Sequence, residues 1–305
     1  FSLSREILRY RPHVVLVNAI TIPVWILAAR IFRVPTICHV HEAERDESRL
    51  ALAALAAPLG LAQSIIVNSE SAMTALCDRP FVRTDRIRQI YNGVPYGVIR
   101  KPTMRLNETA DINILYVGRL SPRKGPDVLI KAIDHLVDQD YRLNVSIAGS
   151  AFEGYEWFED MLRYEASQLK IKDTVSFLGY VDSPFSVVSD NTIVVVPSRH
   201  EPFGNVAVEA HLNRLPVVAS RVQGLAEIIV DGETGLLFES ENSIDLAAKI
   251  VQMTQDRRLR DECIDSAEAR CRRMFSVDRY QNDICSVVAE VAAKCGRTTA
   301  TPFVR

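Results

Sequence analysis

The stretch INILYVGRLSPRKG, residues 112–125, contains the repeating pattern on which the fold prediction rests. Residues 112–117 are short, apolar and rich in β-branched side chains, as in a strand buried on both faces. A loop with Gly118 follows, and residues 126–139 then carry apolar side chains at helical spacing, with Pro126 suited to a first helical position. A buried strand that leads through a loop into an amphipathic helix is the unit of a doubly wound α/β sheet.

The same alternation continues on both sides of this stretch. Strands are predicted at 14–17, 36–40 and 65–68 before it, and at 143–148, 174–177, 193–196 and 217–220 after it. The helices predicted between and after them include 22–33, 48–61, 156–168, 206–213, 245–255, 257–274 and 278–294. Residues 91–102 join the two series with turn chemistry at Asn92, Gly93 and Pro95. We therefore predict two doubly wound Rossmann-like domains, residues 1–98 and 99–277, with the helix 278–294 packed on the first.

Charge, cysteine spacing and the length of apolar runs exclude several classes of function. The chain has 305 residues and a formal net charge of −2, which disfavours nucleic acid as a partner. Its six cysteines form no CxxC pair, so we expect neither a metal site nor a disulfide framework, and we infer a reducing cytoplasm. The longest apolar run, residues 14–29, contains Asn18 and Pro23 and is shorter than the ~20 residues of a membrane-spanning helix.

The loop VGRLSPRKG, residues 117–125, is the first candidate for chemistry. Gly118 lets backbone approach a ligand closely, and Arg119 and Lys124 place two cations where the next helix begins. The amino end of a helix itself favours anions, so the combination suits a diphosphate. The alternative is an ordinary basic surface loop.

The stretch HEPFGNVAVEA, residues 200–210, is the second candidate. Glu201 is predicted on the loop after a buried strand, and Glu209 on the following helix. Backbone N–H groups near Gly204, Asn205 and Val206 face outward at that helix terminus, and a carboxylate is a natural acceptor for sugar hydroxyls. The alternative is that Glu209 is an exposed helix residue and Glu201 a partner of the helix dipole.

Three further segments end predicted strands. In CHVHEAE, His41 could bond a substrate hydroxyl or could be a satisfied core histidine, and His39 lies on the same strand face. In FLGYVD, the backbone after residue 177 could read a nucleobase edge. In the segment 220–238, Glu227 sits on a short helix and suits a structural role as well as a functional one.

These motifs together resemble the retaining glycosyltransferases of family 4, the group 1 glycosyltransferases of GT-B fold. The matched segments are GRLSPRKG (118–125), FLGYV (177–181), PSRHEPFGNVAVEA (197–210), the run at 223–238, the turn at 90–95, HVHE (39–42) and VNSE (67–70). They occur in the family's order and at compatible spacing, and the resemblance extends over nearly the whole chain.

The resemblance implies a role for each candidate. Arg119 and Lys124 would bind the donor diphosphate, Glu201 the transferred sugar and Glu209 the ribose. Phe203, Gly204, Asn205 and Val206 would meet sugar and phosphate through their backbone, with Gly118 at the phosphate loop. Tyr180 and Val181 would border the base, and His41 would lie near the transferred sugar. Neither a cofactor nor a metal is implied.

The implied activity is retaining transfer of a hexose from a UDP- or GDP-linked donor to a hydroxyl of a glycan or lipid-linked acceptor, in polysaccharide or cell-envelope synthesis. The protein would be cytoplasmic, and a lipid acceptor would place it at the inner face of the membrane. Because the chain begins at Phe1 and lacks the family's Gly-rich first unit, we expect a piece of a longer protein with an incomplete acceptor site. The alternatives are an inactive fragment or non-catalytic nucleotide-sugar binder, and an epimerase or phosphorylase on the same plan.

Overall fold

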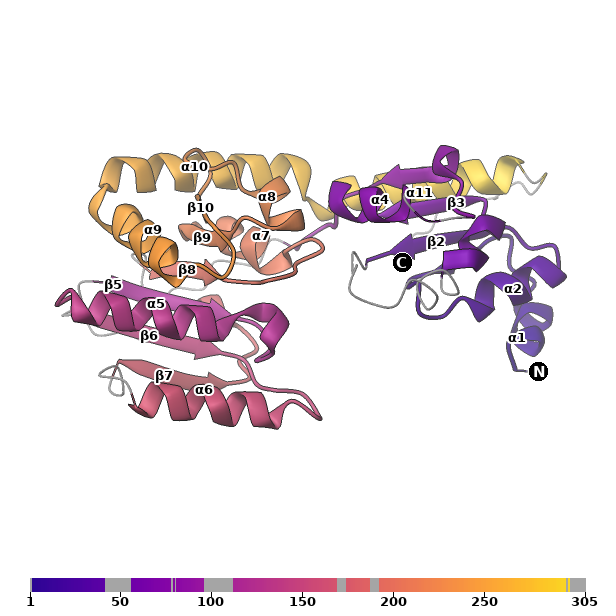
Figure 1. Ribbon diagram of the computed structural model, residues 1–305. Helices are drawn as coiled ribbons and strands as arrows, with labels where there is room; N and C mark the ends of the chain where they lie inside the picture. The colour runs from indigo at the N-terminus through magenta and orange to yellow at the C-terminus, as the bar shows by residue number, and fades with distance from the viewer. Residues whose placement is uncertain are drawn as a thin grey trace. The chain divides into compact units, whose positions relative to one another are not determined.

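The computed structural model describes residues 2–41, 56–77, 79, 81–95, 112–168, 174–186, 192–294 and 296. The chain divides into two compact units, which Figure 1 shows. Unit 1 comprises Phe1–Gly93 and Ser276–Arg305, and unit 2 comprises Val94–Phe275. The boundary predicted between residues 98 and 99 lies outside the described residues.

Unit 2 is built on a parallel sheet with the strand order β10-β9-β8-β5-β6-β7. Its strands are β5 (Ile112–Val117), β6 (Leu143–Ala148), β7 (Val175–Gly179), β8 (Thr192–Val196), β9 (Val217–Ser220) and β10 (Leu236–Phe238). β5 and β8 are neighbours, so the chain turns back at this point and winds the second half of the sheet in the opposite direction. This reversal is the topology of a doubly wound fold, and it confirms the predicted fold class.

Helices connect these strands, and one of them begins at a side-chain cap. They are α5 (Pro126–Asp138), α6 (Glu156–Gln168), α7 (Asn205–Leu212), α8 (Gln223–Ile228), α9 (Ser243–Gln255) and α10 (Arg257–Met274), with short 3-10 turns η3 (Pro122–Lys124) and η4 (Pro184–Ser186). The Asn242 side chain accepts from the Asp245 N–H at 3.0 Å and so caps α9. Ile114 and Tyr116 of β5 pack with Leu129 and Ile133 of α5 in the main core.

Unit 1 has a parallel sheet in the order β1-β2-β3-β4. Its elements are β1 (Val15–Val17), β2 (Thr36–Val40), β3 (Ser64–Val67), β4 (Ile87–Gln89), α1 (Ser2–Tyr10), α2 (Val24–Ile31), α4 (Glu70–Cys77), α11 (Val277–Lys294), and the 3-10 turns η1 (Ala57–Leu61) and η2 (Thr84–Arg86). Cys38 and Val40 of β2 face a core with Ile26 and Leu76. Ile37 points to the other face and packs against Val287 of α11, so the last helix covers that face.

The structure corrects one predicted helix and adds elements that were not predicted. Of the helix predicted at 48–61, residue 56 is helical, residues 57–61 form a 3-10 turn, and residues 48–55 lie outside the described part. Pro58 has no N–H and Gly60 disfavours a helix interior, so a regular helix does not form there. The added elements are α1, α4 and β4. β4 is a short edge strand with two polar residues, so it lacks the apolar run by which the other strands were predicted.

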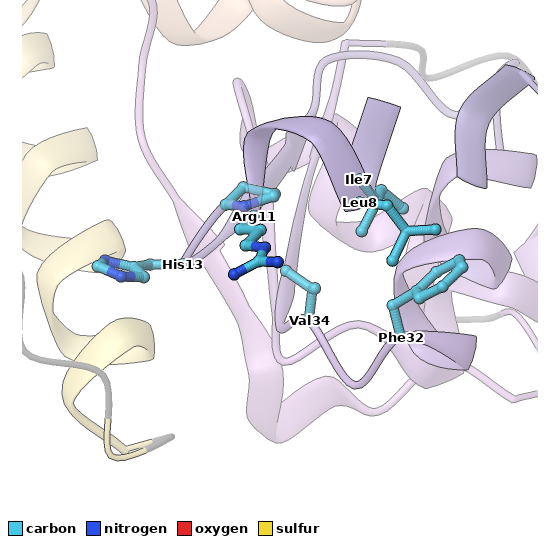
Figure 2. Close-up of a pocket in the computed structure, with 7 residues that line it drawn as sticks. Ile7, Leu8, Arg11, His13, Phe32 and Val34 are labelled. Atoms are coloured by element: carbon cyan, nitrogen blue, oxygen red, sulfur yellow. The ribbon is translucent and has the colours of Figure 1, made fainter. Parts of the chain in front are cut away.

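Figure 2 shows a pocket of about 350 Å³ in unit 1. It is lined by Ile7, Leu8, Arg11, Pro12, His13, Phe32 and Val34, and none of the predicted site residues lines it. Ile7 and Leu8 come from α1, and Phe32 follows α2. No helix in the described residues combines the length and the apolar character needed to cross a bilayer.

Candidate active site

Lys124 and Glu201 meet at the carboxyl ends of the neighbouring strands β5 and β8. The Lys124 ammonium forms an ion pair with the Glu201 carboxylate, and the two side chains are 18% and 10% exposed. The Ser198 hydroxyl donates to the same carboxylate oxygen at 3.2 Å. Two donors therefore hold the Glu201 carboxylate, and one of them carries a positive charge.

Close backbone packing shapes the loop that carries Lys124. Gly125 has a φ of 66°, and a Cβ at this position would lie 2.0 Å from the carbonyl oxygen of Pro197. A glycine is therefore required both by the left-handed conformation and by the approach of the loop after β8. The contact brings Lys124 beside the segment that carries Glu201.

Arg199 links the same two loops through its side chain. Its guanidinium makes a bidentate ion pair with Asp127 of α5, at 2.9 and 2.6 Å, and donates to the carbonyl of Pro122 at 2.6 Å. Glu241 accepts from Nε at 2.8 Å. The hydrogen bond to Asp127 raises the pKa of Arg199 above its ordinary value, so the guanidinium remains charged.

Backbone bonds add to this link. The N–H of Arg199 donates to the carbonyl of Arg123 at 2.9 Å, and the Arg123 guanidinium donates to the carbonyl of His200 at 3.0 Å. The residues that directly precede Glu201 and Lys124 are thus fixed to one another. Such a network holds a site in one geometry before any ligand arrives.

Arg119, the other predicted cation, is exposed and has a different environment. Its guanidinium lies over the ring of Phe152, 5.6 Å from the ring centre. The buried Tyr116 hydroxyl donates to the Arg119 carbonyl at 2.8 Å, and burial raises the pKa of that hydroxyl. In the described part of the chain no carboxylate pairs with Arg119, so its charge is available to an anion.

Three glycines align the loops at this end of the sheet. Gly118, at φ 156°, donates its N–H to the Ala148 carbonyl at 3.0 Å, and Gly149 donates to Gly179 at 2.7 Å. A Cβ on Gly149 would lie 1.8 Å from the Gly118 carbonyl oxygen. The loops after β5, β6 and β7 therefore lie in backbone contact in that order.

Tyr180 and Val181, predicted to border the base, follow the edge strand β7 in this row of loops. Tyr180 is 79% exposed and Val181 is half-buried. Their backbone is thus at the same end of the sheet as the cations, as the prediction requires. Their contact with a base remains a prediction.

Gly204, with a φ of 116°, is the cap residue before α7, and Asn205 and Val206 are the first residues of the helix. The first N–H groups of a helix have no partner within it, so this end favours an anion. Glu209 lies further along α7 and is half-buried, and burial raises the pKa of its carboxyl. Among the described residues no side chain or N–H donates to that carboxylate, so it can accept from a ligand hydroxyl.

Phe203 is a core residue as well as a loop residue. Its side chain is 3% exposed and packs edge-to-face on Phe275, with ring centres 5.6 Å apart. The predicted role used only its backbone, and the structure adds that its ring anchors the loop.

His41, in unit 1, follows β2. Its Nε2 lies 2.9 Å from Oδ1 of Asn18, and its Nδ1 lies 3.5 Å from Nδ2 of Asn68. The ring of His39 is 4.0 Å away, and burial lowers the pKa of His39 to about 3. Glu42, the last residue of the matched HVHE motif, lies outside the described residues.

Two neighbours of Glu201 were not predicted. Ser198 donates to its carboxylate, and Gln223 accepts from its backbone N–H at 2.7 Å. Ser198 lay within the quoted motif, but a serine before a loop has many ordinary uses. Gln223 is the first residue of the matched run at 223–238, and nothing in one sequence shows that its amide reaches back across the loop.

Residues 104–270 match the family model described as glycosyl transferases group 1. The chain belongs to this family. Residues 1–96 match the model of glycosyltransferase family 4, which agrees with the resemblance stated from the motifs.

Curated glycosyltransferases are among the relatives of the chain. A D-inositol 3-phosphate glycosyltransferase of Acidothermus cellulolyticus is 31% identical over 254 residues, which are 79% of this chain and 56% of that protein. An uncharacterised glycosyltransferase of Methanocaldococcus jannaschii is 37% identical over 172 residues, 56% of this chain and 44% of that protein. The chain spans about half the length of these curated relatives.

Solved structures share the fold. The Anabaena protein HepE, crystallised with UDP-glucose, superposes with a TM-score of 0.84 at 23% identity, over 95% of this chain and 81% of that chain. Sucrose-phosphate synthase from Thermosynechococcus elongatus superposes with a TM-score of 0.81 at 21% identity, over 95% and 76%. These likenesses confirm the two-domain GT-B fold.

Proposed function

We propose that this chain is the greater part of a retaining, metal-independent glycosyltransferase, which moves a hexose from a UDP- or GDP-linked donor to a hydroxyl of a glycan or lipid-linked acceptor. The observation that carries the proposal is the mostly buried Lys124–Glu201 ion pair at the carboxyl ends of β5 and β8. Doubly wound sheets bind their ligands at this end. HepE, which shares the fold, was crystallised with UDP-glucose, so UDP is the first nucleotide to test.

In this proposal the donor diphosphate lies among three sources of positive charge. Arg119 has a charge that no described carboxylate neutralises, Lys124 can share its charge between Glu201 and a phosphate, and the first N–H groups of α7 add a partial charge. These groups stabilise the negative charge that develops on the leaving diphosphate. The half-buried Glu209 carboxylate accepts from the ribose hydroxyls.

Glu201 is proposed to contact the transferred sugar rather than to attack it. Its carboxylate is held by Lys124 and Ser198, which lowers its value as a nucleophile and fixes it as an acceptor for sugar hydroxyls. The bond from the anomeric carbon to the diphosphate then breaks as the acceptor oxygen bonds to that carbon on the same face. The acceptor proton passes to the departing phosphate oxygen, so configuration is retained.

Transfer by the intact protein, with Lys124→Ala and Glu201→Ala, tests the proposal. We expect each substitution to lower kcat/KM at least 100-fold, because each removes a charged contact in a water-poor site. Near-normal transfer in either variant would contradict the site. Release of free nucleotide from donor alone would favour an epimerase, and donor binding without turnover would favour a non-catalytic binder.

The acceptor and the location follow from the same proposal. An acceptor carried on a lipid would bring this cytoplasmic protein to the inner membrane face as a peripheral protein, in polysaccharide or cell-envelope synthesis. A vesicle-binding assay with and without lipid-linked acceptor tests this part, and transfer to soluble glycans alone would contradict it.

A further inference from the structure

Gln223 combines an unfavourable backbone conformation with a side-chain bond to the candidate site. Its φ is 37°, in the left-handed region that glycine adopts more readily than any residue with a Cβ. Its Oε1 accepts from the backbone N–H of Glu201 at 2.7 Å. Strained residues of this kind persist where the surrounding structure requires them, and they gather at functional sites.

The next residue, Gly224, also forms a hydrogen bond with the backbone of Glu201. Gly224 donates its N–H to the carbonyl of Glu201 at 3.1 Å, so both backbone groups of Glu201 bond to the turn that begins α8. A Cβ on Gly224 would lie 2.3 Å from the carbonyl oxygen of Phe203. The α8 turn therefore lies directly against the loop of residues 201–203.

Glu201 is therefore held through both its side chain and its backbone. Lys124 and Ser198 bind the side chain, and Gln223 and Gly224 bind the backbone. In the proposed function, the phosphates of a bound donor attract Lys124, and this weakens the ion pair between Lys124 and the Glu201 carboxylate. The backbone bonds to residues 223 and 224 do not involve any donor contact proposed above, so they persist when the donor binds.

We propose that Gln223 is a positioning residue, which fixes the Glu201 backbone so that its carboxylate meets the transferred sugar at a constant distance. This inference rests on the proposed sugar-transfer function. Gln223 touches neither the diphosphate nor the ribose in this scheme, so its loss should affect the transfer step and leave nucleotide binding unchanged.

Two substitutions distinguish the effect of the hydrogen bond to the Glu201 N–H from the effect of backbone strain at Gln223. Gln223→Met keeps the side-chain length and the left-handed strain but removes the acceptor for the Glu201 N–H. Gln223→Gly also removes the acceptor, and it relieves the strain. Asp140→Gly is the matched control, because Asp140 is exposed, has a φ of 65° and ends the turn after α5.

The measurements are kcat and donor KM for transfer, the Kd for UDP, the Tm, and hydrogen exchange of the Glu201 amide. For both Gln223 variants we expect kcat to fall about 10-fold, donor KM and UDP Kd to stay within 2-fold, and exchange at Glu201 to accelerate at least 10-fold. We expect Gln223→Gly to keep its Tm within about 2 °C, since strain relief offsets the lost bond. Asp140→Gly should leave kcat and exchange at Glu201 unchanged.

Each contrary result has a distinct meaning. Unchanged kcat, or unchanged Glu201 exchange, in both Gln223 variants would overturn the positioning role. A fall of Tm with UDP binding weakened to the same degree as kcat would show that Gln223 serves folding only. If the unsubstituted chain neither binds UDP or GDP nor transfers sugar, the proposed function fails, and the exchange measurement still decides whether Gln223 holds Glu201.

Discussion

Arg199 and Asp127 form a bidentate ion pair that links the loop after β8 to the first turn of α5, with N–O distances of 2.9 and 2.6 Å. Asp127 is the second residue of α5, three residues after Lys124, and Arg199 lies two residues before Glu201. The pair therefore controls how far apart the two strand-end loops lie.

Replacement of Arg199 by lysine should damage both stability and activity. A single ammonium cannot reproduce two parallel bonds to Asp127 together with the bond to the Pro122 carbonyl. We expect the free energy of unfolding to fall by about 2–3 kcal/mol, since the pair is only partly exposed. Urea unfolding of Arg199→Lys measures this. Arg258→Lys, in an exposed pair with Glu262 on α10, is the control and should leave the free energy of unfolding unchanged, because water screens exposed ion pairs.

Gly125→Ala should be far more harmful than alanine at another left-handed glycine. At Gly125 the added Cβ meets the Pro197 carbonyl at 2.0 Å, whereas at Gly154, with φ 90°, it meets nothing within 4 Å. We expect Gly154→Ala to cost about 1 kcal/mol from backbone strain alone and Gly125→Ala to cost at least about 3 kcal/mol. Thermal unfolding compares the two, and equal losses would show that the loops can separate.

The affinity for UDP should depend on the protonation of Glu209. Burial raises the pKa of this carboxyl, so it takes up a proton at a higher pH than an ordinary glutamate. A neutral carboxyl is a poorer acceptor for ribose hydroxyls, and UDP binding should weaken as the pH falls through that raised pKa. Glu209→Gln should bind UDP more weakly at pH 7 and lose this part of the pH dependence. A parallel pH profile in the two proteins would contradict the ribose contact.

His211 should make the fold sensitive to acid. It is 1% exposed, and neither ring nitrogen has a hydrogen-bond partner in the described chain. Burial, with a smaller effect from Arg270, lowers its pKa to about 3. The unfolded chain therefore binds more protons between pH 3 and about 6.5, and stability is lost as the pH falls through this window.

The variant His211→Met tests the effect of this histidine. It removes two unpartnered polar atoms, and we expect it to add about 1–3 kcal/mol at pH 7 and to flatten the decline of stability below pH 6.5. Urea unfolding at pH 7 and pH 5 is the measurement. An equal decline in both proteins would assign the acid sensitivity to other groups.

The sequence predicted the sheet of unit 2 well, because its strands are continuous apolar runs and its helices carry one apolar stripe each. Pro126 and the segment 112–125 located the turn between β5 and α5 within a residue. β4 was not predicted because it is a three-residue edge strand that depends on its pairing with β3. Local pattern cannot reveal elements that tertiary contacts stabilise.

The candidate site was predictable in its residue types but not in its connections. Glu201, Lys124 and Glu209 stood out as charges at strand ends and on a helix. The Arg199–Asp127 ion pair and the hydrogen bond to Gln223 depend on which loops contact one another at the end of the sheet. A single sequence does not show those contacts. The roles taken from the family resemblance remain predictions until a ligand is measured.

Calorimetry of UDP and UMP binding to this chain tests the central claim most directly, since the claim is that Lys124 contacts the donor diphosphate. We predict that the chain binds UDP at least 10-fold more tightly than UMP, and that Lys124→Ala removes most of this difference. Lys131→Ala, at an exposed position of α5, the helix that follows Lys124, should retain the difference in full. An unchanged preference for UDP in Lys124→Ala, or equal affinity for UDP and UMP in the unsubstituted chain, would contradict the account.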